Sequence, residues 1–123
     1  MLGLLKNRRE TGQQAESIAE KYLHKAKLKT LNKNYSCRFG EIDLIMSDQQ
    51  TIVFVEVRYR KNTSYGSGAE TVTPHKQARI IKTAQYYLQQ HSMFSNKPAR
   101  FDVISISNTQ NKLAIDWIKN AFC

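Results

Sequence analysis

The segment TIVFVEVRYR, residues 51–60, constrains the fold more than any other part of the chain. Its β-branched and aromatic residues are typical of a buried strand, yet a glutamate, Glu56, stands between two valines. Strand alternation places Glu56 and Arg58 on one face, and Val57 and Tyr59 on the other. Because a carboxylate buried alone is costly, Glu56 needs a cation, hydrogen-bond donors or a metal ion as its partner.

The hydrophobic periodicity of the sequence predicts two amphipathic helices and five strands. The helical segments run from Thr11 to Leu28 and from Thr73 to about His91. The second is expected to bury one stripe of side chains: Gln77, Ile81, Ala84 and Leu88. The strand-like segments are residues 30–38, 39–47, 51–60, 100–107 and 112–119. The order α-β-β-β-α-β-β predicts an α/β fold, a mixed five-stranded sheet with helices packed on it, whose third and fourth strands can run parallel.

Length and charge set the broad class of the protein. The 123 residues predict one domain, 1–123, with residues 1–10 as a flexible terminus. Nineteen Lys and Arg against ten Asp and Glu give a net charge of +9, which favours an anionic partner, with nucleic acid ahead of a membrane. The two cysteines lack metal-site spacing, and the apolar run near the N-terminus is short, so we expect a cytoplasmic protein.

Asp43, inside EIDLIM, is a second carboxylate in an apolar strand-like segment. The register of the hairpin that residues 39–47 and 51–60 would form decides whether Asp43 and Glu56 meet. A two-residue turn at residues 48–49 places Asp43 opposite Phe54 and diagonal to Glu56. A four-residue turn at 48–51 places Asp43 opposite Glu56, whereas a three-residue turn separates them. Two carboxylates on one face repel each other unless a cation lies between them, and Mg²⁺ is the natural candidate.

The spacing from Asp43 to Glu56-Val57-Arg58 resembles the PD-(D/E)xK nuclease signature, with a helix glutamate ahead of it as in archaeal Holliday-junction resolvases. The chain is also similar to the YraN-like family of small bacterial proteins, through AESIAEKYL, NKNYSCRFGEIDLI, VFVEVRYR and RFDVISI. This resemblance implies a restriction-endonuclease-like fold and a Mg²⁺ or Mn²⁺ site for phosphodiester hydrolysis.

The resemblance also implies roles for single residues. Asp43 and Glu56 would be metal ligands, the carbonyl of Val57 a third, and Glu16 a ligand directly or through water. Without the resemblance, the sequence favours the interpretation of Glu16 as a solvated acid that complements the helix dipole.

Arg58 stands where the nuclease signature has lysine. An arginine stays protonated, so it can clamp a phosphate but cannot act as a base. Lys76, at the start of the second helix, is either a substitute cation or a solvated lysine.

Further polar residues surround the expected site. Glu41 shares the face of Asp43 and either extends the site or is a charged residue at the strand edge. Gln77, on the predicted stripe, needs a hydrogen-bond partner and would find one in the carboxylate cluster. The nucleic-acid contacts are expected from cations and an aromatic side chain that read equally as a solvated rim: Arg58, Arg60, Lys61, Tyr65 and Lys76.

Two functions follow as expectations. The first is a Mg²⁺-dependent endonuclease, catalysing through Asp43, Glu56, Glu16, Arg58 and Lys76, that acts on DNA more readily than RNA and on branched or single-stranded substrates. The alternative is a nucleic-acid-binding module on the same fold that no longer cuts. A resolvase needs two active sites, which makes a homodimer possible. The three histidines lack metal-ligand spacing and are assigned no chemistry.

Overall fold

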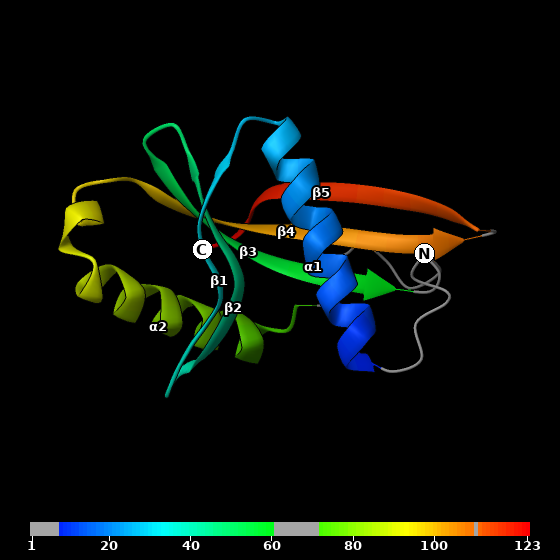
Figure 1. Ribbon diagram of the computed structural model, residues 1–123. Helices are drawn as coiled ribbons and strands as arrows, with labels where there is room; N and C mark the ends of the chain where they lie inside the picture. Colours follow the sequence, from blue (N-terminus) through cyan, green and yellow to red (C-terminus); the bar gives the residue numbers. More distant parts are fainter. Residues whose placement is uncertain (1–7, 61–71, 110) are drawn as a thin grey trace.

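The computed structural model describes residues 8–60, 72–109 and 111–123. In these ranges the elements follow the predicted order, with one short 3-10 helix added after α2 (Figure 1): α1 (Arg8–Lys25), β1 (Lys29–Cys37), β2 (Gly40–Asp48), β3 (Thr51–Arg60), α2 (Pro74–Gln90), η3 (Ser92–Phe94), β4 (Ala99–Thr109) and β5 (Lys112–Phe122). The predicted α/β fold is confirmed. None of the helices in these ranges is long and apolar enough to cross a membrane.

All five strands form one sheet in the order β1-β2-β3-β4-β5. Neighbouring strands are antiparallel except β3 and β4, which run parallel because α2 carries the chain back along the sheet. β3 is the central strand and pairs along both edges, which fits its long run of β-branched residues. The sheet is therefore mixed, as predicted.

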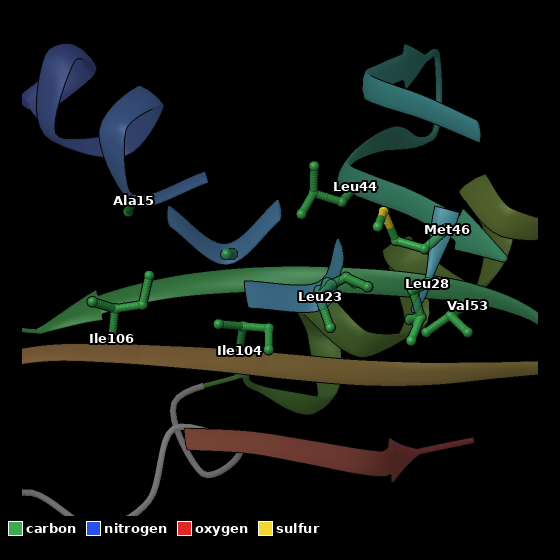
Figure 2. Packing of buried hydrophobic residues seen from close by; sticks show 10 residues of the cluster. Ala15, Leu23, Leu28, Leu44, Met46, Val53, Ile104 and Ile106 are labelled. Atoms are coloured by element: carbon green, nitrogen blue, oxygen red, sulfur yellow. The ribbon is translucent and has the colours of Figure 1, made fainter. Parts of the chain in front are cut away.

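The two α-helices cover opposite faces of the sheet (Figure 1). Alternation along β3 sends Val53 and Val55 to the α1 face, and Ile52 and Phe54 to the α2 face. Figure 2 shows buried side chains that α1, the segment after it and three strands contribute to the core on the α1 face: Ala15, Leu23, Leu28, Leu44, Met46, Val53, Ile104 and Ile106. The predicted division of β3 into two faces is confirmed.

α1 begins one turn earlier than the sequence pattern indicated. Its first residue is Arg8, so Thr11 lies inside the helix and does not begin it. The sequence Arg8-Arg9-Glu10 contains good helix formers and no breaker, so the helix continues toward the N-terminus. Of the ten residues expected to be flexible, residues 1–7 lie outside the described residues and the last three are helical.

The buried stripe of α2 differs from the prediction. The fully buried side chains are Ile80, Thr83, Ala84 and Tyr87, whereas Gln77, Ile81 and Leu88 are only half-buried. Apolar residues occur in adjacent pairs along this helix, so the 3.6-residue period fits two neighbouring stripes equally well. The large Tyr87 ring decides between them because it packs edge-on against Tyr35 of β1 and Phe54 of β3.

The β2–β3 turn fixes the register of the hairpin. Gln49 and Gln50 form the turn, and Asp48 pairs with Thr51. Gln49 has a φ of 57°, which suits a two-residue hairpin turn. This two-residue turn lies one residue later than the two-residue alternative, and its register is the one expected for the four-residue alternative. Continuing this register by one residue beyond the Leu44–Val55 pair places position 43 opposite position 56.

Asp102 of β4 is fully buried and plays a structural role at an irregularity in the β4–β5 ladder. Its carboxylate accepts hydrogen bonds from Arg100 Nε at 3.1 Å, Trp117 Nε1 at 2.9 Å and the backbone N–H of Asn120 at 3.0 Å. Asn120 lies in the stretch where the register shifts and has a φ of 52°. The side chain thus replaces the ladder partner that the shifted strand cannot supply.

Replacing Asp102 by alanine is expected to lower the free energy of unfolding by about 3 kcal/mol, because it leaves buried donors without acceptors. Urea denaturation followed by circular dichroism measures this change. The matched control is Asp116→Ala, since Asp116 is exposed on β5, and its effect should stay within about 0.5 kcal/mol. Equal effects of the two substitutions would contradict the role assigned to Asp102.

Candidate functional site

The strands β2 and β3 part at Asp43 and Glu56. Their regular pairing ends at Leu44 and Val55, and beyond it the backbone N–H of Val57 donates to Asp43 Oδ2 at 2.8 Å. A side-chain oxygen thus takes the place of a backbone carbonyl in the ladder. This contact holds the Asp43 carboxyl beside Glu56, with which it forms a side-chain hydrogen bond.

α1 adds a third carboxyl group to this pair. The side chain of Glu16 hydrogen-bonds to the side chains of Asp43 and Asn34, and partial burial raises its pKa. Asn34 lies on β1 with a φ of 52°, a left-handed conformation that asparagine tolerates better than most residues. The sequence did not point to Asn34. Its signal would have been an asparagine inside a strand, directly across from an acidic residue.

Burial and neighbouring acidic groups both perturb the carboxyl of Asp43. Burial, followed by the charge of Glu56, raises the pKa of Asp43 from 3.8 to about 8, although the N–H of Val57 opposes the shift. The charge of Glu16 adds a smaller upward contribution to this pKa. Because the Asp43 carboxyl is buried beside the charges of Glu56 and Glu16, a bound cation would stabilise its ionised form.

Two cations neutralise Glu56, which is only 5% exposed. Lys76 Nζ lies 2.5 Å from Glu56 Oε2, and Arg58 Nη1 lies 3.7 Å from the same oxygen. Lys76 reaches this position because α2 begins beside the sheet, with Thr73 as its N-cap and Pro74 at its first position. The need of Glu56 for a cation, predicted from its apolar strand, is met within the chain.

The carboxylates open into a cavity of about 390 Å³ between the sheet and α2. Acidic side chains come from the strands, and basic side chains come from the first two turns of the helix. The lining residues are Gly40, Glu41, Asp43, Glu56, His75, Lys76, Arg79 and Ile80. A cavity with carboxylates on one wall and cations on the other suits an anionic group that binds together with a metal ion.

Gly40 allows the β1–β2 turn to approach α2 closely at one edge of this cavity. Its φ is 150°, and a Cβ atom there would lie 3.2 Å from Thr83 Oγ1 and 3.7 Å from Arg79 Nε. Arg79 Nε also donates to the carbonyl oxygen of Phe39 at 3.3 Å. The arginine thus fastens the turn to the helix while lining the cavity.

Of the two further polar residues predicted near the site, Glu41 lines the cavity and Gln77 does not. Glu41 is exposed and lines the cavity, and its charge contributes to the raised pKa of Glu16. Gln77 donates from Nε2 to the carbonyl oxygen of Val72 at 2.9 Å and does not line the cavity, so the expectation that it reaches the carboxylates is wrong. The reason is that α2 buries a different stripe of side chains from the predicted one, so the Gln77 amide bonds to Val72 and not to the carboxylates.

The expected nucleic-acid contacts are only partly described. Arg60 is half-buried at the end of β3 and does not line the cavity. Lys61 and Tyr65 lie outside the described residues. Sequence reasoning missed His75 and Arg79, which stand one and five residues after Pro74 on the helix side that faces the cavity.

The donor set fits a hard divalent cation. Across residues 8–60, 72–109 and 111–123, no three His, Cys, Asp or Glu side chains are grouped so as to hold a metal ion by themselves. Mg²⁺, however, is commonly bound by one or two carboxylates, with water and substrate phosphates completing its shell. Asp43 and Glu56 supply such a pair, Glu16 adjoins Asp43, and the peptide of Val57 lies beside them.

The family model described as "Uncharacterised protein family UPF0102" matches residues 15–106. A UPF0102 protein of Saccharophagus degradans is 50% identical over 113 residues, which cover 92% of each chain. One from Nitrosococcus oceani is 46% identical over 93% of this chain and 92% of its own. One from Alcanivorax borkumensis is 44% identical over 97% and 96%. The range matched by the family model contains every residue that lines the cavity.

Asp43→Asn is expected to stabilise the metal-free protein and to flatten its stability profile between pH 4 and pH 8. In that range the folded protein holds a proton on Asp43 that the unfolded chain has released, so stability falls as the pH rises toward about 8. Each pKa unit of such a shift corresponds to about 1.4 kcal/mol. An asparagine oxygen still accepts from Val57 and carries no charge.

Urea denaturation in EDTA at pH 5 and pH 8 measures this effect. We expect the loss of stability over that range to be smaller in Asp43→Asn than in the unsubstituted protein, by at least about 1 kcal/mol. Asp116→Asn, an exposed carboxylate away from the cavity, is the control and should keep the original pH profile. A profile unchanged by Asp43→Asn would show that the carboxyl is not perturbed.

Proposed function

Since this chain belongs to the uncharacterised protein family UPF0102, we propose a function from its own site: a Mg²⁺-dependent endonuclease that hydrolyses phosphodiester bonds in DNA. The observation that carries the proposal is the meeting of Asp43 and Glu56 where β2 and β3 part. Natural chains rarely crowd buried carboxylates without a use for them, because the arrangement costs stability. The cavity beside them offers room and positive charge for a phosphate.

The acidic side chains would hold the metal. Asp43 and Glu56 are the principal ligands in this proposal, the carbonyl of Val57 is a third, and Glu16 acts directly or through water. When bound, Mg²⁺ supplies a water molecule of lowered pKa and stabilises the charge that builds up on the phosphate. Mn²⁺ prefers the same oxygen ligands and should substitute for it.

The basic side chains would hold the substrate. Lys76 lines the cavity, and both Lys76 and Arg58 contact Glu56, so a phosphate beside Glu56 lies within reach of two cations. The net charge of +9 attracts the polyanion to the surface, and the cavity cations orient one phosphate of it. Arg58 stays protonated, so it acts here as a clamp and takes no part in proton transfer.

Removal of one metal ligand should separate cleavage from binding. Asp43→Asn and Glu56→Gln are each expected to reduce cleavage by at least about 100-fold, since they weaken the proposed metal site. Binding measured in EDTA should change by less than about three-fold. The assay incubates labelled single-stranded, duplex, flap and four-way-junction DNA, and RNA, with Mg²⁺, Mn²⁺ or EDTA. Asp116→Asn is the control, and metal-dependent cleavage that survives in Asp43→Asn would exclude this site.

A specific observation favours a second function, a nucleic-acid-binding module that does not cut. Glu56 already has two cationic partners from the chain itself, Lys76 and Arg58, so its charge is balanced without a metal ion. In such a module the carboxylates would serve only to position these cations. The two functions differ in metal dependence. The endonuclease needs Mg²⁺ to cleave, whereas the module binds nucleic acid equally well in EDTA and does not cleave it.

The two cations that contact Glu56 should contribute to the salt dependence of binding under either function. Lys76→Gln and Arg58→Gln are each expected to reduce the magnitude of the slope of log K against log salt concentration by about one. The reason is that binding with one phosphate contact fewer displaces fewer counterions from the nucleic acid. Fluorescence anisotropy over a salt series measures the slope. Lys112→Gln, on an exposed residue at the start of β5 that does not line the cavity, is the matched control. Binding that does not respond to salt would contradict both functions.

A further inference from the structure

A pair of aromatic side chains, Phe39 and Tyr86, lies outside both hydrophobic cores. Their ring centroids are 5.9 Å apart with an interplanar angle of 63°. The guanidinium carbon of Arg38 lies 4.8 Å from the centroid of Phe39. Both rings are half-buried, and Arg38 is exposed. Core packing therefore does not account for this group of one cation and two aromatic rings.

The group stands at the rim of the cavity. Phe39 directly precedes Gly40, which lines the cavity, and its carbonyl oxygen accepts from Arg79, which lines it too. The contact with Arg79 and the close approach at Gly40 hold the β1–β2 turn against α2. The aromatic pair is thus fixed beside the edge of the cavity at Gly40.

A row of side chains on α2 connects the cavity to this pair. His75, Arg79, Lys82 and Tyr86 follow each other at intervals of four, three and four residues, so at about 100° per residue they lie along one side of the helix. The first three are exposed, and the first two line the cavity. Eleven residues of helix span about 16 Å, which is long enough for a few successive nucleotides.

We infer that Arg38, Phe39 and Tyr86 form a stacking site for an unpaired nucleobase, and that the α2 row guides the adjoining phosphates into the cavity. This inference rests on the nucleic-acid binding of the proposed function and adds the substrate class. Aromatic rings and arginine planes stack on bases whose faces are free, which single strands, flaps and open junctions offer and continuous duplex does not. Lys82 and Arg79 neutralise phosphates along the same path.

Removing an aromatic ring should weaken binding to single strands selectively. Phe39→Leu and Tyr86→Leu are each expected to raise the Kd for a labelled single-stranded DNA by about ten-fold, and the Kd for the duplex of the same length by less than two-fold. Fluorescence anisotropy in EDTA provides both values, with thermal unfolding as the check on folding. Tyr22→Leu is the matched control, because Tyr22 is 37% exposed on α1 and contacts Trp117. An equal loss for both DNAs, or no loss, would overturn the stacking site.

Photocrosslinking of the unsubstituted protein gives a second test that no folding defect can obscure. Single-stranded DNA carrying 5-iodouracil should crosslink to Phe39 or Tyr86, as located by mass spectrometry. Crosslinks confined to other aromatic residues would overturn the inference. Neither measurement requires cleavage, so a selective loss in Phe39→Leu without any nuclease activity would uphold the stacking site and reject the nuclease. Cleavage that is lost in Asp43→Asn but unchanged in Phe39→Leu would uphold the nuclease and reject the stacking site.

Discussion

The ion pair between Glu56 and Lys76 joins the central strand β3 to the first turn of α2, and much of the site depends on it. Glu56 is 5% exposed in an otherwise apolar strand, so its charge has to be balanced nearby. The pairing brings the beginning of α2 over the opening between β2 and β3, where Asp43 lies next to Glu56. Polar contacts then run without interruption from Glu16 of α1 through Asp43 and Glu56 to Lys76 of α2. This line crosses the sheet from one helical layer to the other.

Comparison of Asp43 with the buried Asp102 shows why the site stands apart from the rest of the structure. Asp102 receives hydrogen bonds from one cation, one indole and one backbone N–H, so its charge is well satisfied. Asp43 receives one backbone N–H, and its burial, together with the charge of its acidic neighbours, raises its pKa to about 8. A chain selected for stability alone would satisfy both aspartates in the same way. The Asp43 carboxyl, buried beside acidic neighbours, is where a bound cation would have most to contribute.

Much of the fold was predictable because burial in a sheet imposes a period of two. The faces of β3 followed from its sequence, and the shared face of Asp43 and Glu56 survived a turn at a different residue because parity alone decides it. The predicted buried stripe of α2 was right at Ala84 and wrong at its other positions, because adjacent apolar residues fit two stripes and the packing of Tyr87 selects one. The early start of α1 was missed because helix formers precede the expected cap.

The site was less predictable than the fold, since much of its wall arises from tertiary contacts without a local pattern. Arg79 and His75 line the cavity only because Gly40 lets the β1–β2 turn pack against α2. The residues of the site come from positions far apart in the chain, from Glu16 on α1 to Arg79 on α2. The site therefore exists only when the strands have paired and both helices have docked. A nascent or partly unfolded chain carries the same acidic and basic residues without assembling them, so the proposed activity would itself report complete folding.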